Sequence, residues 1–262
     1  MAYLLAGCEK KTEWPLKTQD TNLIVVDGMI TNERKVHTIT INYPVTQLNE
    51  KPQPVTGATV LISDNDSTFT LTEQPANSGI YQTNNNFSCQ LDKIYSLLIN
   101  HENKVYTAKT YMVRGNPKVQ TLSFIKSGNL FHIKWDIAQY NAQKPSMWEI
   151  LLDWSKVPGY TSQNPDSCKA RLLFYTLPTL DVSEIFAPEV EKVYFPSKTI
   201  VNLRRYSLNP DHAEFIRSLL LETNWQGGLF SSVPANVPTN LSEGAVGFFG
   251  ACEVESISQT VP

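Results

Sequence analysis

The N-terminal part of the chain contains short stretches in which apolar and polar residues alternate, separated by turn-forming residues. Residues 23–30 are a β-branched run, residues 36–43 alternate, and residues 58–63 and 68–71 flank a turn-forming sequence. A period of two over such lengths is typical of strands with one buried face. About seven segments of this kind before residue 115 predict a β-sandwich over residues 22–114.

A second group of strands follows the turn formers Gly115-Asn116-Pro117, where we place the domain boundary. One strand, residues 147–154, has four large apolar side chains on a single face, which should be core: Trp148, Ile150, Leu152 and Trp154. Further strands are predicted at residues 119–126, 130–136, 169–176, 190–195, 198–203 and 245–257. Residues 118–262 are therefore predicted to form a second β-rich domain.

One amphipathic helix is predicted within this second domain, at about residues 210–223. Asn209 is a good N-cap, and Pro210 suits the first helical position. Four apolar residues recur at helical spacing and should form its buried face: Phe215, Ile216, Leu219 and Leu220.

The first eight residues match the end of a lipoprotein signal. A short apolar run from Met1 leads into Leu5-Ala6-Gly7-Cys8, and a polar segment at residues 9–21 follows. In such a box the signal is cut before the cysteine, which is then acylated. We interpret residues 1–8 as a truncated signal, Cys8 as the lipidation site and residues 9–21 as a tether. The alternative is an ordinary buried cysteine after a chance apolar run.

Composition excludes several classes of protein. The chain has 262 residues and a formal net charge of −3, with no basic block, which argues against binding to nucleic acid. No stretch of about 18 apolar residues occurs, so no transmembrane helix is predicted.

If Cys8 carries lipid, three cysteines remain, and at least one of them is unpaired. Cys168 and Cys252 lie in the same predicted domain, so we favour a disulfide between them. Three buried free thiols, with Cys89 as the third, are the alternative. No CxxC or HExxH spacing occurs, so no metal site and no cofactor is predicted.

No catalytic constellation stands out. The four histidines are scattered, and no GxSxG sequence marks a nucleophilic serine. Asp64-Asn65-Asp66 has oxygen ligands for calcium but lacks the glycine and distal glutamate of a calcium loop, so a hairpin turn is the better interpretation. We expect no enzymatic activity. A hydrolase with an unmarked carboxylate pair would require a deep pocket.

The Gly-, Pro- and Asn-rich loop near residues 227–240 is the best candidate for contact with a partner or ligand, because long ordered loops on β scaffolds often carry function. Its candidate residues are Trp225, Leu229, Phe230, Asn236 and Asn240. The alternative is that Leu229 and Phe230 plug the end of the core.

Several stretches combine into a recognisable pattern. They are the box at residues 5–8, Asp27-Gly28 in the first strand, residues 54–60, Tyr206-Ser207-Leu208, Gly227-Gly228-Leu229-Phe230, Pro234-Ala235-Asn236-Val237, Asn240 and Gly247-Phe248-Phe249-Gly250-Ala251. Together they resemble the Bacteroidota lipoproteins grouped as a domain of unknown function, often encoded beside TonB-dependent (SusC-like) transporters.

The resemblance implies a lipid-anchored protein of the bacterial outer membrane, exposed at the cell surface, that serves such a β-barrel transporter. It brings no catalytic residues. Residues 54–60 also resemble the immunoglobulin-like or prealbumin-like modules of exported proteins, which is consistent with a sandwich of that type. A stand-alone surface adhesin or glycan-binding module is the alternative function.

Overall fold

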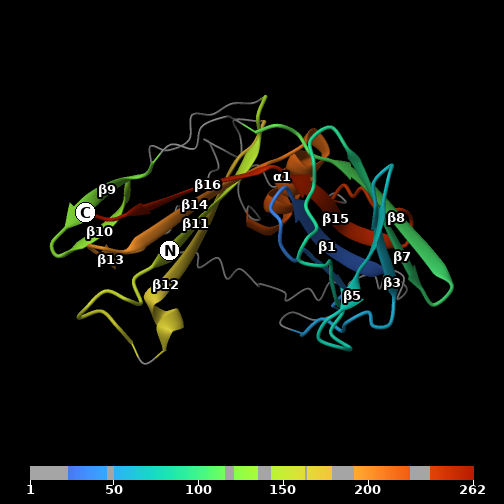
Figure 1. Cartoon of the computed structure of the whole chain (residues 1–262), viewed down its shortest axis with the longest axis horizontal. Helices are drawn as coiled ribbons and strands as arrows, with labels where there is room; N and C mark the ends of the chain where they lie inside the picture. The colour runs from blue at the N-terminus through green and yellow to red at the C-terminus, as the bar shows by residue number, and fades with distance from the viewer. Residues whose placement is uncertain are drawn as a thin grey trace, which may run out of the picture.

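The computed structural model describes residues 23–45, 50–115, 121–134, 143–162, 164–178, 192–224 and 237–262. Within them the protein is mainly β, with strands arranged in four sheets and one α-helix, as the sequence predicts. The strands form two units that lie side by side along the long axis of the molecule (Figure 1).

The first unit is a sandwich of two sheets. One sheet has the order β15-β1-β2-β6-β5, and the other has the order β4-β3-β7-β8. Their strands are β1 (Ile24–Thr31), β2 (Thr38–Asn42), β3 (Thr59–Ser63), β4 (Thr68–Thr70), β5 (Thr72–Glu73), β6 (Ile80–Gln82), β7 (Ile94–His101), β8 (Lys104–Tyr111) and β15 (Ala245–Cys252). Alternate residues of both sheets, among them Ile39, Ile41, Val60 and Leu97, are buried in one core.

The second unit pairs a three-stranded with a four-stranded sheet, of orders β13-β10-β9 and β12-β11-β14-β16. Its elements are β9 (Ser123–Ser127), β10 (Leu130–Lys134), β11 (Ser146–Asp153), the 3₁₀ helix η1 (Pro165–Cys168), β12 (Lys169–Thr176), β13 (Phe195–Pro196), β14 (Ile200–Ser207) and β16 (Val254–Thr260). Trp148, Ile150 and Leu152 of β11 are buried in its core as predicted, and Trp154 packs against them half-buried.

The predicted domain boundary is only partly right, because the C-terminal strand returns to the first unit. β15 pairs in parallel with β1, from Ile24 opposite Ala245 to Thr31 opposite Cys252. Only Glu253 separates β15 from β16, which pairs with β14 in the second unit. One nearly continuous strand therefore crosses between the units (Figure 1). The pattern along residues 245–257 predicts a strand, but a parallel partner more than 200 residues earlier leaves no local signal.

Helix α1 (Pro210–Asn224) forms where the sequence predicts it. The side-chain Oδ1 of Asn209 accepts a hydrogen bond from the His212 amide at 2.8 Å, which confirms the predicted N-cap. The predicted buried face needs a correction: Ala213 and Ile216 are buried, whereas Leu219 is 40% exposed. The helix is rotated toward its His212 side because that side packs on β15.

The contact between the two units has an apolar core of its own. Its buried members are Leu177, Tyr206, Leu208, Ala213, Ile216, Cys252 and Val254. Five of these residues come from β14, α1, β15 and β16, while Leu177 follows β12 and Leu208 follows β14. The helix and the crossing strand therefore help to fasten the units to each other. Among the described helices, none has the length and apolar character required to cross a bilayer.

Candidate functional site

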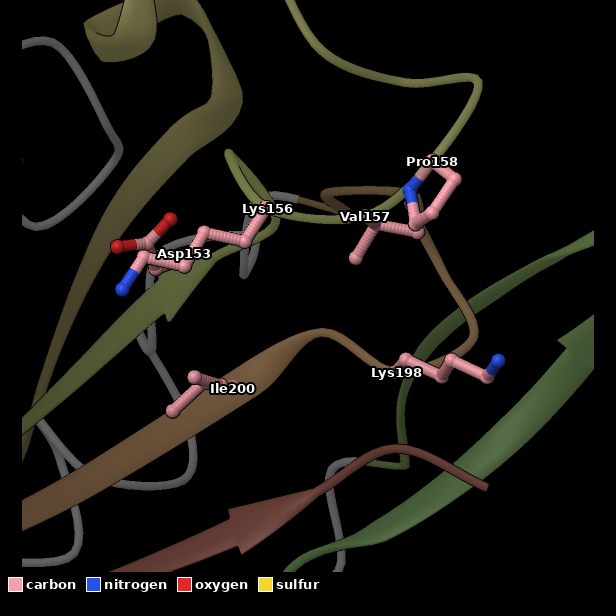
Figure 2. Close-up of a pocket in the computed structure, with 6 residues that line it drawn as sticks. All are labelled: Asp153, Lys156, Val157, Pro158, Lys198 and Ile200. Atoms are coloured by element: carbon pink, nitrogen blue, oxygen red, sulfur yellow. The ribbon is translucent and has the colours of Figure 1, made fainter.

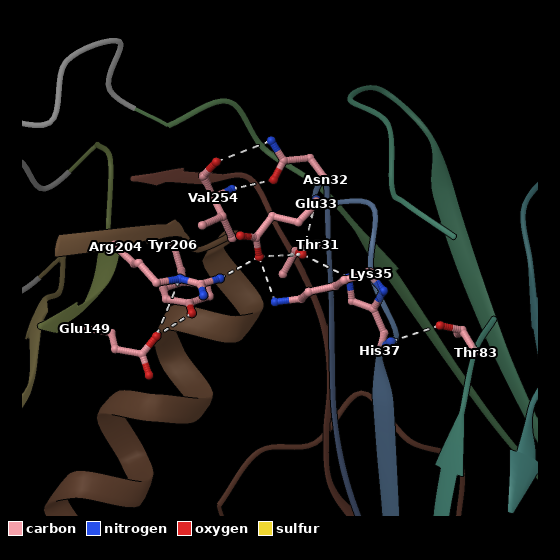
Figure 3. Close-up of polar contacts among 10 residues, drawn as sticks. All are labelled: Thr31, Asn32, Glu33, Lys35, His37, Thr83, Glu149, Arg204, Tyr206 and Val254. Carbon is pink, nitrogen blue, oxygen red and sulfur yellow. Dashed lines mark hydrogen bonds and ion pairs between the residues drawn. The ribbon is translucent and has the colours of Figure 1, made fainter. Parts of the chain in front are cut away.

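A network of charged residues spans the junction between the units. The Arg204 guanidinium donates to Glu33 Oε2 at 2.5 Å, and its Nε lies 3.6 Å from Glu149 Oε2. Arg171 donates to the other oxygen of Glu149 at 2.6 Å, and the Tyr206 hydroxyl donates to Glu149 at 2.7 Å. Figure 3 shows Glu33 reaching from the turn after β1 to Arg204 on β14.

Sheet register explains why these side chains meet. Glu149 of β11 lies directly opposite Arg204 of β14, so both side chains leave the same face of the sheet. Tyr206 lies two residues further along β14, on that same face. The face is the one turned toward the first unit, where Glu33 supplies the second carboxylate.

The carboxylates of this network are held ionised. Burial alone would raise the pKa of Glu149, but the Tyr206 hydrogen bond and Arg171 outweigh it and leave the pKa below its usual 4.5. Glu33 behaves likewise, because Lys35 and Arg204 lower its pKa against the effect of burial. The pKa of Tyr206 is raised by burial and by its hydrogen bond to Glu149. Neither carboxyl group is therefore prepared to act as a general acid near neutral pH.

Asn32 makes a second polar link across the junction. Its Oδ1 accepts from the Val254 amide at 2.7 Å, and its Nδ2 donates to the Val254 carbonyl at 3.4 Å. The carboxamide thus takes the place of a neighbouring strand at the first residue of β16 (Figure 3).

A cysteine and a histidine approach each other behind α1. Cys252 Sγ lies 3.7 Å from Nδ1 of His212, whose ring stacks on Phe248 at 4.7 Å between centroids. A nucleophilic thiol needs a lowered pKa and access to substrate. Here burial raises the pKa of Cys252 and lowers that of His212 to about 4, so a neutral thiol faces a neutral imidazole inside the core. The pair is a packing contact.

The predicted disulfide between Cys168 and Cys252 is wrong. Both thiols are free and buried, as is Cys89. Cys168 donates to the Tyr160 carbonyl at 3.2 Å beside η1, while Cys252 lies in the junction core next to His212. The two residues belong to different units, because β15 leaves the second domain to which the sequence assigned it.

Most of the predicted partner loop, Trp225, Leu229, Phe230 and Asn236, lies outside the described residues, as does Cys8. Asn240 is described, and its side chain points into the protein. Its Nδ2 donates to the carbonyls of Lys109 and Phe249, and its Oδ1 accepts from the Phe249 amide. Asn240 therefore closes the gap between β8 and β15, and its amide is not directed to a partner.

The predicted turn at Asp64-Asn65-Asp66 is confirmed. Asp64 Oδ1 accepts from the amides of Asp66 and Ser67, which closes the hairpin between β3 and β4. The Lys93 ammonium binds Asp64 at 3.0 Å and Asp66 at 2.9 Å, in the position a cation ligated by these carboxylates would take. Over the described ranges, no cluster of three or more His, Cys, Asp or Glu has the arrangement of a metal site.

The described surface includes the following two hollows. The smaller, about 120 Å³, lies at the far end of the second unit beside Asp153, Val157 and Ile200. The Asp153 carboxylate already accepts hydrogen bonds from the amide and the hydroxyl of Ser155. The side chain of Lys198 points away from Asp153 (Figure 2). This hollow is too small for a ligand larger than a few atoms.

The larger hollow, about 490 Å³, lies where the end of β8, the residues before β11 and the start of α1 meet. It is close to Gly115, the predicted domain boundary. Sequence reasoning did not single out its cations, Arg114 and Lys144. Their position beside a boundary was the only available signal, and it does not distinguish them from other surface cations.

Comparison with protein families gives one result that covers nearly the whole chain. A family model described as "Domain of unknown function (DUF4249)" matches residues 9–258. Among curated proteins, none matches the sequence. Since the match extends over both β units and the crossing strand, the chain belongs to this family of unknown function.

Proposed function

We propose that this chain is a non-enzymatic, lipid-anchored protein of the bacterial outer membrane, exposed at the cell surface, that acts as an accessory or substrate-capture partner of a TonB-dependent transporter. The state of the charged groups at the junction carries the non-enzymatic part of the proposal. Glu33 and Glu149 both bind Arg204, and the contact of Arg204 with Glu33 joins the two units, so these residues act as structural groups. A catalytic acid or base would need a pKa near the working pH and an open path to substrate.

Anchoring is supported by the box at residues 5–8, which places an acylatable cysteine before a polar tether. Two or more acyl chains hold a protein stably at a membrane, whereas one chain binds only marginally. Confinement to the membrane of the transporter raises the effective concentration of the pair, so a modest interface would suffice.

Co-purification tests the proposal. The chain is tagged after Pro262, whose side chain is exposed, and native outer membranes are extracted in mild detergent. We expect a stoichiometric β-barrel transporter in the eluate, identified by mass spectrometry. Recovery of the lipoprotein alone, at low salt and high expression, would contradict the partnership.

A Cys8→Ser variant is the matched control, since it removes the acylated thiol and leaves the described fold intact. We expect it to leave the membrane fraction and to lose the transporter. If the variant stays with the membrane, anchoring through Cys8 is wrong.

The second candidate is a glycan-binding module that acts without a transporter. Tyr194 is 47% exposed, and its ring packs edge-on against His132 at 5.4 Å between centroids. A flat aromatic surface of this kind can stack on a sugar ring. Loss of polysaccharide binding in Tyr194→Ala, combined with recovery of the chain alone from membranes, would favour this function.

A further inference from the structure

The larger cavity at the junction has the size of a small-molecule site. Its volume of about 490 Å³ falls within the roughly 300–1,000 Å³ typical of such pockets. Its walls come from segments far apart in the sequence, so it exists only in the folded, joined state of the two units. None of its described lining residues is Asp or Glu, whereas Arg114 and Lys144 contribute two cations.

The two cations have capacity to bind a ligand. The Arg114 side chain is exposed, and among the described residues its guanidinium has no carboxylate partner. Lys144 donates to the Gly115 carbonyl at 3.2 Å, and an ammonium has three protons to donate. The nearby carboxylate of Glu253 accepts from the Gly115 amide at 2.6 Å and keeps its single negative charge. Against it the described lining sets two cations, so the cavity presents net positive charge.

Apolar groups form the rest of the cavity. Pro145 and Leu208 are buried in its wall, Pro210 lines it at the first turn of α1, and the Tyr111 ring is 40% exposed at its edge. A tyrosine ring and proline rings are flat surfaces against which a cyclic group packs well. The N-terminal end of α1 adds a further positive contribution.

We propose that this cavity binds a small organic anion with a cyclic apolar body, its anionic group held by Arg114 and Lys144 and its ring packed against Tyr111 and the prolines. The inference stands apart from the transporter proposal, because the isolated chain binds the ligand. Either proposal can fail while the other holds.

Ligand-observed NMR titrations test the inference. The full chain carrying Cys8→Ser is titrated with benzoate, with phenyl phosphate and with benzyl alcohol, which has the ring without the charge. We expect at least one of the anions to bind about tenfold more tightly than the alcohol, because a charge-assisted hydrogen bond is made only with the anion. Equal binding of all three probes, or binding of none, would overturn the inference.

Substitution of the cations locates the site. Arg114→Gln and Lys144→Gln are each expected to weaken binding of the anion about tenfold, with little effect on the alcohol. Because Lys144 also binds Gly115, Arg114→Glu at an exposed position provides a variant whose folding is not at risk. Lys126→Glu on β9 makes an equal change of charge far from the cavity and should leave binding unchanged. If Arg114→Glu binds the anion as well as Lys126→Glu does, the inference is wrong.

Discussion

The side chain of Asn240 forms with Phe249 the pair of hydrogen bonds that a neighbouring strand would form. Its Nδ2 donates to the Phe249 carbonyl at 2.7 Å, its Oδ1 accepts from the Phe249 amide at 3.0 Å, and Nδ2 also reaches the Lys109 carbonyl at 2.9 Å. One carboxamide thereby closes the seam between the two sheets of the first unit. Asn32 forms the same pair of hydrogen bonds with Val254, the first residue of β16, and so links the two units.

Replacing Asn240 with alanine should therefore destabilise the protein, although the residue lies in a loop. The change leaves backbone groups of β15 and β8 without a partner, which costs about 2 kcal/mol in the free energy of unfolding. Asn85→Ala, at an exposed position, is the matched control and should change it by less than about 0.5 kcal/mol. Denaturant unfolding measures both. Equal stability of the two variants would show that the seam does not depend on Asn240.

The sequence predicts the elements of this fold well and their long-range partners poorly. The strand at residues 147–154 and the helix with its Asn209 cap follow from local periodicity and capping, which report burial within one element. No pattern in the sequence near residues 245–252 predicts that they pair with β1. The disulfide prediction failed for the same reason, since it placed Cys252 in the second unit.

The candidate site was predictable only in part. Asn240 stands out in the sequence as a polar residue in an ordered loop, but whether its amide faces a partner or the protein depends on where β8 and β15 meet. Glu33, Glu149 and Arg204 are ordinary strand and turn residues until the sheet register and the contact of the two units bring them together.

The parallel pairing of β1 with β15 requires glycine at position 247. Gly247 has φ of +100°, and a Cβ built there would lie 2.1 Å from the Val26 carbonyl oxygen. Gly247→Ala should lower the free energy of unfolding by at least about 3 kcal/mol, because it adds both backbone strain and a clash with a fixed backbone atom.

Gly57→Ala separates these two effects. Gly57 also has a positive φ, +69°, but a Cβ there meets nothing within 4 Å. Gly57→Ala should lower the free energy of unfolding only by the cost of the backbone strain, about 1 kcal/mol. If thermal or denaturant unfolding finds the two variants equally stable, the close approach of β15 to β1 is not as described.

The three thiols of the described residues should be reduced and slow to react in the native state. Cys89, Cys168 and Cys252 are free and buried, and burial raises the pKa of Cys89 to about 12. Alkylation of the Cys8→Ser chain, followed by mass spectrometry, should add almost no label before denaturation and three labels after it without reductant. Two labels fewer under those conditions would indicate a disulfide.

Stability should fall as the pH drops below neutral, before the carboxylates titrate. Burial lowers the pKa of His37 and of His212 from 6.5 to about 4. Between pH 6.5 and pH 4 both imidazoles are therefore protonated in the unfolded chain and neutral in the native state. Each histidine contributes stability that is complete above pH 6.5 and is lost toward pH 4, with a slope of up to about 1.4 kcal/mol per pH unit.

Denaturant unfolding from neutral pH to about pH 5 measures this slope, since the lowered pKa values of Glu33 and Glu149 put their effect at lower pH. His212→Gln, which cannot titrate, should be less stable at neutral pH but should show about half the slope. A wild-type stability that is flat over this range would contradict the neutral, buried state of both histidines.

Within the junction network, Glu149 should matter more than Glu33. The Glu149 side chain is 9% exposed and contacts Arg171, Arg204 and Tyr206, whereas Glu33 is 31% exposed and contacts Lys35 and Arg204. Glu149→Gln removes the charged acceptor that the Tyr206 hydroxyl and the half-buried Arg204 share, and it should lower the free energy of unfolding by about 2 kcal/mol. Glu33→Gln should lower it by about 1 kcal/mol, because solvent replaces much of the pairing of this more exposed group. A double-mutant cycle of each glutamate with Arg204→Met, followed by denaturant unfolding, separates the two couplings. A larger cost for Glu33→Gln would mean that the contact between units, and not the pairing within the sheet, holds the network together.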